Sequence, residues 1–165
     1  MTRSRPLRLE DDLGFLLSRA SGLVAAQTNR VLAPLELKVR PYSLLVLACE
    51  NEDGVTQRNV ASTLGLDPSQ IVALVDELER RDLVERVPDR SDRRNKRILA
   101  TENGMALVED AQNRVAEVHR RLFGELPEGA AEGLATLLQG AIRRSDPSGA
   151  GSWTTVTHWS WHSDG

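Results

Sequence analysis

The segment QRNVASTLGLDPSQIVALVDEL, residues 57–78, decides the fold class of this chain. Two helices that cross at a steep angle need a small residue at the crossing and a left-handed residue in the turn between them. Ala61 and Gly65 stand at those two positions. Ile71 and Leu74 are spaced to fill the gap between the helices. The pattern predicts a helix-turn-helix, although a plain pair of antiparallel helices can carry a similar one.

Capping residues predict the limits of both helices. Thr56 is placed to cap the first helix, and Gly65 to end it. Asp67 is placed to cap the second, with Pro68 at its first position and Gln70 completing a capping-box pattern. The apolar periodicity then carries the second helix to about residue 81.

A basic hairpin follows the helix pair. The runs LVERVPD and NKRILAT, residues 83–89 and 95–101, are short, β-branched or alternating, and joined by a polar turn. Six basic residues and two aspartates lie between positions 86 and 97, which leaves a local charge of +4 in a chain of net charge −3. A charge run alone is usually a solvated loop. Beside a helix-turn-helix, this one indicates a contact with nucleic acid.

Such a hairpin would overhang the minor groove while the second helix lies in the major groove, and arginine suits a narrow, negatively charged channel. Asp92 could hold the Arg94 guanidinium in an ion pair, and Asp89 could orient Arg90 or cap the turn. Gln70 could read an adenine, or it could only cap its own helix. The expected DNA-binding residues are Thr56, Gln57 and Arg58 at phosphates, Ser69, Gln70, Val72 and Ala73 at base edges, and Arg90, Asp92, Arg93, Arg94 and Lys96 in the hairpin.

The rest of the chain reads as helices with irregular ends. We expect a flexible arm at residues 1–8, dimerisation helices at 9–38 and 102–144, a winged helix-turn-helix domain at 39–101, and a flexible tail with three tryptophans at 145–165. The helix after Thr101 has an apolar row resembling a coiled-coil seam, which could pair with a second copy or serve an intramolecular core. Pro127 is expected to open the last helix. The predicted fold class is mainly α: six helices, a two-stranded β-wing, and long N- and C-terminal helices forming a dimerisation domain.

Composition and missing motifs limit the function classes. The content of 40% hydrophobic and 27% charged residues is ordinary for a soluble protein, and no apolar run approaches the ~20 residues of a membrane span. With no signal-peptide stretch and a single cysteine, a cytoplasmic protein without membrane contact is expected. There is no G-x-S-x-G, P-loop or H-E-x-x-H motif, so we expect no enzyme, no catalytic residue and no cofactor. His158 and His162 have the spacing of a metal pair, but weak helical context and no nearby third ligand argue against a metal site.

The chain resembles the MarR-type winged-helix regulators over roughly residues 10–144. The family's wing pattern D-x-x-D-x-R…L-x-T-x-x-G is carried here by Asp89, Asp92, Arg94, Leu99, Thr101 and Gly104. The resemblance implies an obligate homodimer joined through the first, fifth and sixth helices and a roughly palindromic operator on double-stranded DNA. It also implies repression that is relieved by a small phenolic or aromatic anion, or by cysteine oxidation.

Three positions depart from the family pattern. The family usually has glycine at the positions of Glu36 and Asp82, and often a polar or basic residue at Ala73. Asp tolerates left-handed geometry better than most residues, at some cost. Weak base readout at Ala73 would make readout of DNA shape proportionally larger.

Effector binding has two candidate residues, and the function has two alternatives. Arg19 and Tyr42 lie on helices that flank the family's effector pocket, where Arg19 could pair with a carboxylate and Tyr42 could stack on a ring; either could instead serve the interface. Cys49 could sense oxidation, but no Lys, Arg or His stands within one turn to lower its pKa. We therefore expect a sequence-specific DNA-binding regulator, most simply a homodimeric repressor released by a small ligand. The alternatives are a redox-sensing regulator acting through Cys49, and a winged-helix protein-interaction module without specific DNA binding.

Overall fold

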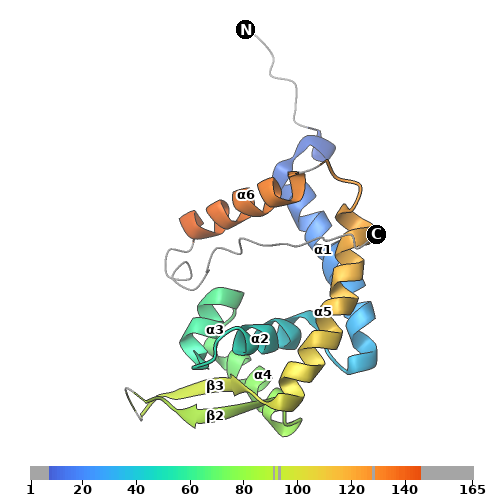
Figure 1. Cartoon of the computed structure of the whole chain (residues 1–165). Coiled ribbons are helices and arrows are strands. Elements are labelled where there is room, and N and C mark those ends of the chain that lie inside the picture. The colour runs from blue at the N-terminus through green and yellow to red at the C-terminus, as the bar shows by residue number, and fades with distance from the viewer. Residues whose placement is uncertain (1–7, 91, 93, 128, 146–165) are drawn as a thin grey trace.

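The computed structural model describes residues 8–90, 92, 94–127 and 129–145. Helices dominate it, as the sequence predicts, and it contains one small antiparallel sheet (Figure 1). In chain order the elements are η1 (Leu9–Asp11), α1 (Leu13–Leu32), η2 (Ala33–Leu35), α2 (Val39–Cys49), β1 (Val55–Thr56), α3 (Gln57–Leu64), α4 (Pro68–Arg80), β2 (Val84–Pro88), β3 (Lys96–Ala100), α5 (Glu102–Phe123) and α6 (Ala130–Ser145). The predicted fold class is confirmed.

The two long helices α1 and α5 pack side by side and carry the winged part of the molecule at one end (Figure 1). On α5, Val108, Ala111, Val115 and Val118 are buried within the chain, while Met105 is 53% exposed. The coiled-coil-like row on this helix therefore serves mainly the intramolecular core, which was one of the two alternatives.

In the winged part, the apolar core is built from α2, α3, α4 and β3, and it is continuous with the buried residues of α5. Leu45, Val60, Ile71 and Ile98 are fully buried there. The helix α2, which reads as apolar on nearly all sides, lies in the middle, as that pattern predicts. Burying a side chain of this kind contributes about 1.5–3 kcal/mol, so this core fixes the relative positions of α3 and α4.

A third strand, β1, was missed by the sequence prediction of a two-stranded hairpin. The sheet order is β1-β3-β2, all antiparallel, with Val55 opposite Ile98 and Val84 opposite Ala100. Gly54 precedes β1 with φ of 76°, and a Cβ there would lie 2.9 Å from the carbonyl oxygen of Ile98. Two residues are too few for an alternation pattern, so no sequence signal marks β1.

The last helix, α6, begins at Ala130 rather than directly at Pro127. It buries none of its own residues: Leu134, Leu137 and Ile142 are 41%, 72% and 43% exposed. Figure 1 shows α6 extending sideways from the upper part of the α1–α5 pair, above α2 and α3 and away from the sheet. Within the described part of the chain, no helix is long and apolar enough to cross a membrane.

Glu36 and Asp82 both adopt left-handed backbone conformations, with φ of 53° and 55°. They are two of the three positions at which the sequence departs from the family pattern. Glu36 lies between η2 and α2, and Asp82 lies between α4 and β2. The geometry that glycine usually provides is thus kept here without glycine, which costs backbone strain.

Candidate DNA-binding surface

The helix-turn-helix is built as its sequence predicts. The Thr56 hydroxyl accepts a hydrogen bond from the Asn59 N–H at 3.1 Å, which caps α3. Gly65 ends α3 in a left-handed conformation with φ of 62°, and the Leu66 N–H then donates to the Ala61 carbonyl at 3.0 Å. These local contacts turn the chain into α4 within three residues.

The first turns of α4 divide into a buried face and an exposed face. Ile71 and Val75 have no exposed surface, and Leu74 is half-buried against the same core. The predicted base-reading residues lie on the other side of the helix, where Ser69, Gln70, Val72 and Ala73 are all exposed. The arrangement presents four small or polar side chains in one continuous patch.

Gln70 performs the capping role that was one of its two predicted functions. Its Oε1 accepts a hydrogen bond from the Asp67 N–H at 3.2 Å. The side chain is nevertheless exposed, and its amide nitrogen carries two N–H donors. With its oxygen engaged in the cap, Gln70 is better suited to donate to a base than to make a bidentate contact with adenine.

Among the three predicted phosphate-binding residues at the start of α3, only Arg58 is exposed. Thr56 and Gln57 are half-buried, and the Thr56 hydroxyl already serves the helix cap. The N-terminus of a helix such as α3 favours phosphate oxygens, because its dipole and first backbone N–H groups point toward them. Arg58 is thus the strongest candidate for a side-chain phosphate contact among these three.

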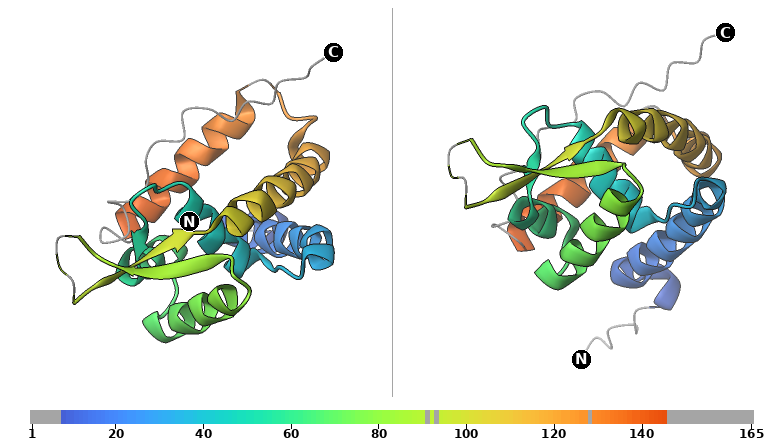
Figure 2. Two further views of the ribbon diagram at one scale, coloured as in Figure 1. Left: turned by 60° about the horizontal axis from the view of Figure 1, so that its bottom comes forward. Right: turned by 90° about the horizontal axis from the view of Figure 1, so that it is seen from below.

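The wing, defined as β2, β3 and the turn between them, projects away from the helices (Figure 2). Arg90, Arg94 and Lys96 are exposed on it, whereas Arg93 lies outside the described residues. Asp92 is exposed as well, but it does not pair with the Arg94 guanidinium as predicted. Its carboxylate accepts the Arg94 backbone N–H at 3.0 Å and the Asn95 side-chain N–H at 3.2 Å, because both donors lie within three residues of it along the chain.

Asp89 pairs with Arg97 instead of orienting Arg90. Asp89 is only 7% exposed, and its Oδ2 accepts a hydrogen bond from Arg97 Nε at 2.7 Å. Arg97 Nη1 also donates to the Gly54 carbonyl at 2.9 Å. This contact joins the turn-side half of β3 to the loop before β1.

Arg86 fastens the wing to α4. Its guanidinium binds Asp76 at 2.5 Å and also binds Glu79, and its backbone N–H donates to Glu79 at 3.2 Å. Burial alone would lower the pKa of Arg86, but the hydrogen bonds to these two carboxylates outweigh it and raise the pKa. Arg86 and Arg97 are thus neutralised inside the chain, so the wing's accessible positive charge is smaller than the sequence count and gathers near its tip.

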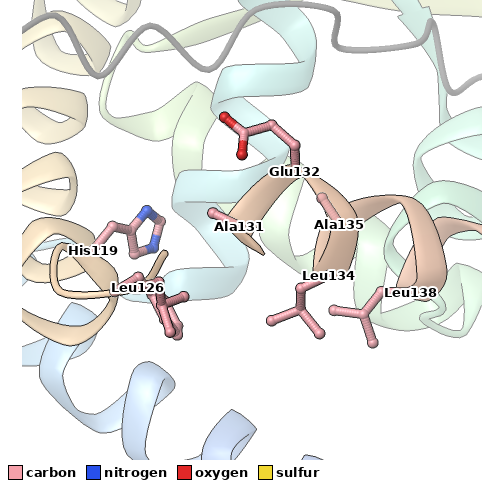
Figure 3. Close-up of a pocket in the computed structure, with 8 residues that line it drawn as sticks. His119, Leu126, Ala131, Glu132, Leu134, Ala135 and Leu138 are labelled. Atoms are coloured by element: carbon pink, nitrogen blue, oxygen red, sulfur yellow. The ribbon is translucent and has the colours of Figure 1, made fainter. Parts of the chain in front are cut away.

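The two predicted effector-binding residues lie on different helices. Arg19 is exposed on α1, and Tyr42 is half-buried on α2, where burial and then the Glu50 charge raise its pKa. A cavity of about 210 Å³ lies between α5 and α6 (Figure 3), and neither side chain lines it. Its walls are almost entirely apolar, with His119, Phe123, Leu126, Ala131, Glu132, Leu134, Ala135 and Leu138 around it.

Cys49 lies half-buried at the end of α2. Burial raises the pKa of its thiol, and the neighbouring Glu50 charge raises it further. A thiol with a raised pKa holds less of the reactive thiolate. Among the described residues no group of three His, Cys, Asp or Glu side chains could hold a metal ion, and His158 and His162 lie outside that set.

A helix-turn-helix with an exposed first turn on α4 and a cationic wing beside it defines a winged-helix DNA-binding regulator. The MarR family model matches residues 37–95. CouR from Rhodococcus jostii RHA1, solved with p-coumaroyl-CoA, is 54% identical, with 82% of this chain and 94% of CouR covered and a TM-score of 0.79. A MarR-family transcriptional regulator from Rhodococcus sp. RHA1 is 52% identical, with 82% and 96% covered and a TM-score of 0.78.

A third similar structure contains DNA. It is a transcriptional repressor, CouR, bound to a 23-mer duplex, at 31% identity, with 84% of this chain and 100% of that one covered and a TM-score of 0.73. The chain belongs to the MarR family. Proteins of this family are transcriptional regulators rather than enzymes, and they act as dimers.

Proposed function

We propose that this protein is a homodimeric, sequence-specific repressor that binds a pseudo-palindromic operator and is released by an aromatic ligand. The observation that carries the proposal is that two exposed surfaces, the first turns of α4 and the cationic wing, belong to the same folded unit. The wing packs beside α4 (Figure 2), and Arg86 on β2 binds Asp76 and Glu79 in the second half of α4, which holds both surfaces on one framework. The DNA-bound relative with 31% identity supports the same reading.

Each surface has a distinct task in this proposal. Ser69, Gln70, Val72 and Ala73 meet base edges in the major groove, where one good contact discriminates by about 1–3 kcal/mol. Small side chains predominate there, so much of the specificity would come from DNA shape. The predicted minor-groove or phosphate contacts are Arg90, Arg94 and Lys96, with Arg93 from the sequence and Arg58 at the start of α3.

A single copy presents few contacts to DNA, which favours two copies on two half-sites. Exposed apolar side chains gather on α1 and α6, and a soluble protein rarely leaves such surfaces open to water. The most exposed of them are Leu13 at 70% and Leu137 at 72%, with Leu16, Leu17, Leu134, Leu138 and Ile142 between 36% and 44%. We assign this surface to the second subunit, in line with the dimers that the family forms.

The effector that we propose is a CoA thioester of a phenolic acid. The support is the relative with 54% identity, whose structure holds p-coumaroyl-CoA. A ligand of this class has an aromatic acyl group and several negative charges, so it needs both an apolar site and cationic side chains. Arg19 and Tyr42 remain candidates for these two roles, although neither lines the cavity between α5 and α6.

The test begins with an operator selected by the protein from a library of random duplexes. Mobility shifts on that operator are then measured with p-coumaroyl-CoA, free CoA and free p-coumarate. We expect release by the thioester at concentrations at which the other two leave the complex intact. Selection of no shared motif would contradict the proposed DNA-binding function, whereas a motif without release by the thioester would contradict the effector class alone.

The two alternatives make different predictions. A protein-interaction module would show no steep salt dependence of DNA affinity, because that dependence comes from phosphate contacts. A redox sensor needs a reactive thiolate, and the raised pKa of Cys49 opposes it.

A further inference from the structure

A contact at the far end of α4 connects this helix to the two long helices. Arg81 follows the last residue of α4 and reaches back 45 residues along the chain. Its guanidinium donates to the Glu36 carbonyl at 2.8 Å and to the Leu35 carbonyl at 3.0 Å. These two carbonyls belong to the connection that leaves α1, so one side chain joins the end of α4 to the end of α1.

The residue after Arg81 makes the same kind of connection to α5. The Asp82 carbonyl accepts the Thr101 hydroxyl at 2.6 Å, and the Asp82 carboxylate accepts the Asn103 side-chain N–H at 2.6 Å. Thr101 also caps α5 by accepting the Gly104 N–H at 3.0 Å. The C-terminal end of α4 is therefore fixed from two sides, by α1 through Arg81 and by α5 through Asp82.

The backbone on both sides of the Arg81 contact is strained. Glu36 and Asp82, with φ of 53° and 55°, are the positive-φ residues other than glycine in the described part of the chain. Strained conformations persist only where surrounding contacts hold them. The guanidinium binds one of these two turns and extends from the other, so it is placed to hold both.

Because the Arg81 contact lies at the C-terminal end of α4, a change of tilt there displaces the opposite, DNA-facing end of the helix. Ser69 lies twelve residues before Arg81, which corresponds to about 18 Å along the helix axis at 1.5 Å per residue. A tilt of about 10° at Arg81 would move the base-reading end by about 3 Å, close to the 3.4 Å rise of one base pair. A small change in the tilt of α4 at Arg81 therefore displaces its base-reading end by a distance comparable to the rise of one base pair.

We propose that Arg81 is a positioning residue for operator binding. It sets the orientation of α4 relative to the α1–α5 pair and thereby the distance between the recognition helices of the two subunits. The proposal rests on the proposed function, because it concerns two copies bound to two half-sites. It also makes the α1–α2 connection the place where a displacement of the long helices would reach α4.

The test measures the distance between the two α4 helices without DNA. Spin labels are attached at Ser69→Cys in a Cys49→Ser background, and electron–electron dipolar spectroscopy gives the distance between the two subunits. Wild-type Arg81 should give one narrow distribution. Arg81→Met, which keeps the aliphatic stem and removes the donors, should shift or broaden it by several ångströms. Arg80→Met is the matched control, since exposed Arg80 makes no such contact, and it should superimpose on wild type.

A second readout uses the selected operator and a version with one base pair inserted between its half-sites. Loss of Arg81 should reduce the discrimination between the two duplexes from about tenfold to about threefold or less. The salt dependence of binding should not change, because Arg81 makes no phosphate contact in this account.

Three outcomes overturn the proposal. The first is a distance distribution of Arg81→Met that superimposes on wild type. The second is an equal loss of affinity on both duplexes. The third is the absence of any dipolar signal in wild type, which would also remove the dimer from the proposed function. If Arg81→Met does not fold, the same two measurements are made on Arg81→Lys. Lysine keeps the positive charge but lacks the planar guanidinium that donates to two carbonyls at once. If no operator is selected, the proposed function is contradicted. The distance measurement, which needs no DNA, still tests the role of Arg81.

Discussion

Two single residues, Glu36 and Asp82, hold backbone geometry that glycine adopts without strain. A left-handed conformation costs an ordinary L-residue roughly 1–2 kcal/mol. Asp82 recovers part of this cost, because its carboxylate accepts a hydrogen bond from Asn103 at 2.6 Å. Glu36 has an exposed side chain, and only its carbonyl oxygen takes part in the hydrogen bond from Arg81. The strain is therefore least compensated at Glu36.

Glu36→Gly should stabilise the protein. We expect the free energy of unfolding to rise by about 0.5–1 kcal/mol, since glycine relieves the strain but also gains freedom in the unfolded chain. Urea unfolding at one fixed protein concentration measures the change. The matched control is Glu109→Gly at an exposed position inside α5, which should lower the free energy of unfolding by about 1 kcal/mol. Destabilisation by Glu36→Gly would show that the Glu36 side chain contributes more than its backbone costs.

The Cys49 thiol should react slowly. Because burial and the Glu50 charge raise its pKa, we expect alkylation by iodoacetamide at pH 8 to be about tenfold slower than that of a free cysteine. Glu50→Gln should lower the pKa and increase the rate by about twofold, whereas Glu52→Gln is the control and should leave it unchanged. Alkylation faster than that of free cysteine would favour the redox-sensing alternative.

Among the elements, the wing and α5 depend on a close approach of their backbones. Leu83 leads into β2, and its carbonyl accepts the Thr101 N–H at 3.1 Å just before α5 begins. A Cβ on Gly104 would lie 2.0 Å from that same carbonyl oxygen. The family's glycine at this position is therefore required by packing of α5 on the wing and not by an unusual backbone angle.

Gly104→Ala should destabilise the protein by at least about 2 kcal/mol, because a backbone atom must move to make room. The same substitution at Gly22, inside α1 with nothing within 4 Å, should be neutral or stabilising by up to about 1 kcal/mol. Thermal unfolding of both variants at equal concentration compares them. Equal melting temperatures would mean that the turn at Leu83 relaxes easily.

Arg86→Met should loosen the wing from α4 while leaving both elements folded. We expect DNA affinity to fall by about tenfold with helix content unchanged, because the ion pairs to Asp76 and Glu79, which join the wing to α4, are lost. Anisotropy on the selected operator and far-ultraviolet circular dichroism measure the two effects. Unchanged affinity would mean that the strand pairing alone orients the wing.

How far the sequence predicted these elements depends on how local their determinants are. The cap of α3 by Thr56 and the left-handed Gly65 depend on neighbours within a few positions, and both were predicted. The contacts of Arg97 with Gly54 and of Arg81 with Glu36 join residues 43 and 45 positions apart, and no local pattern marks them. The hairpin's arginines look alike in sequence, so the division into structural and exposed ones became visible only in the fold.

At the scale of the whole molecule, the chain separates a DNA-facing end from a partner-facing end. The wing and α4 lie at one end, while exposed apolar residues of α1 and α6 lie at the other (Figure 1). The long helices α1 and α5 connect the two. In the function that we propose, a ligand that changes how two copies pack would act on the recognition helices through α1 and α5.

The central claim is that two copies bind one operator through α4 and the wing. The most direct measurement is fluorescence anisotropy of the selected operator with wild type, Arg94→Ala and the control Arg143→Ala, which changes an exposed residue on α6, over a series of salt concentrations. We predict saturation at two chains per duplex and a steep fall of log affinity with log salt for wild type and the control. Arg94→Ala should bind more weakly, with a slope reduced by about 1–2, since one cation is lost per subunit. Saturation at one chain per duplex, or a slope that Arg94→Ala leaves unchanged, would contradict the claim.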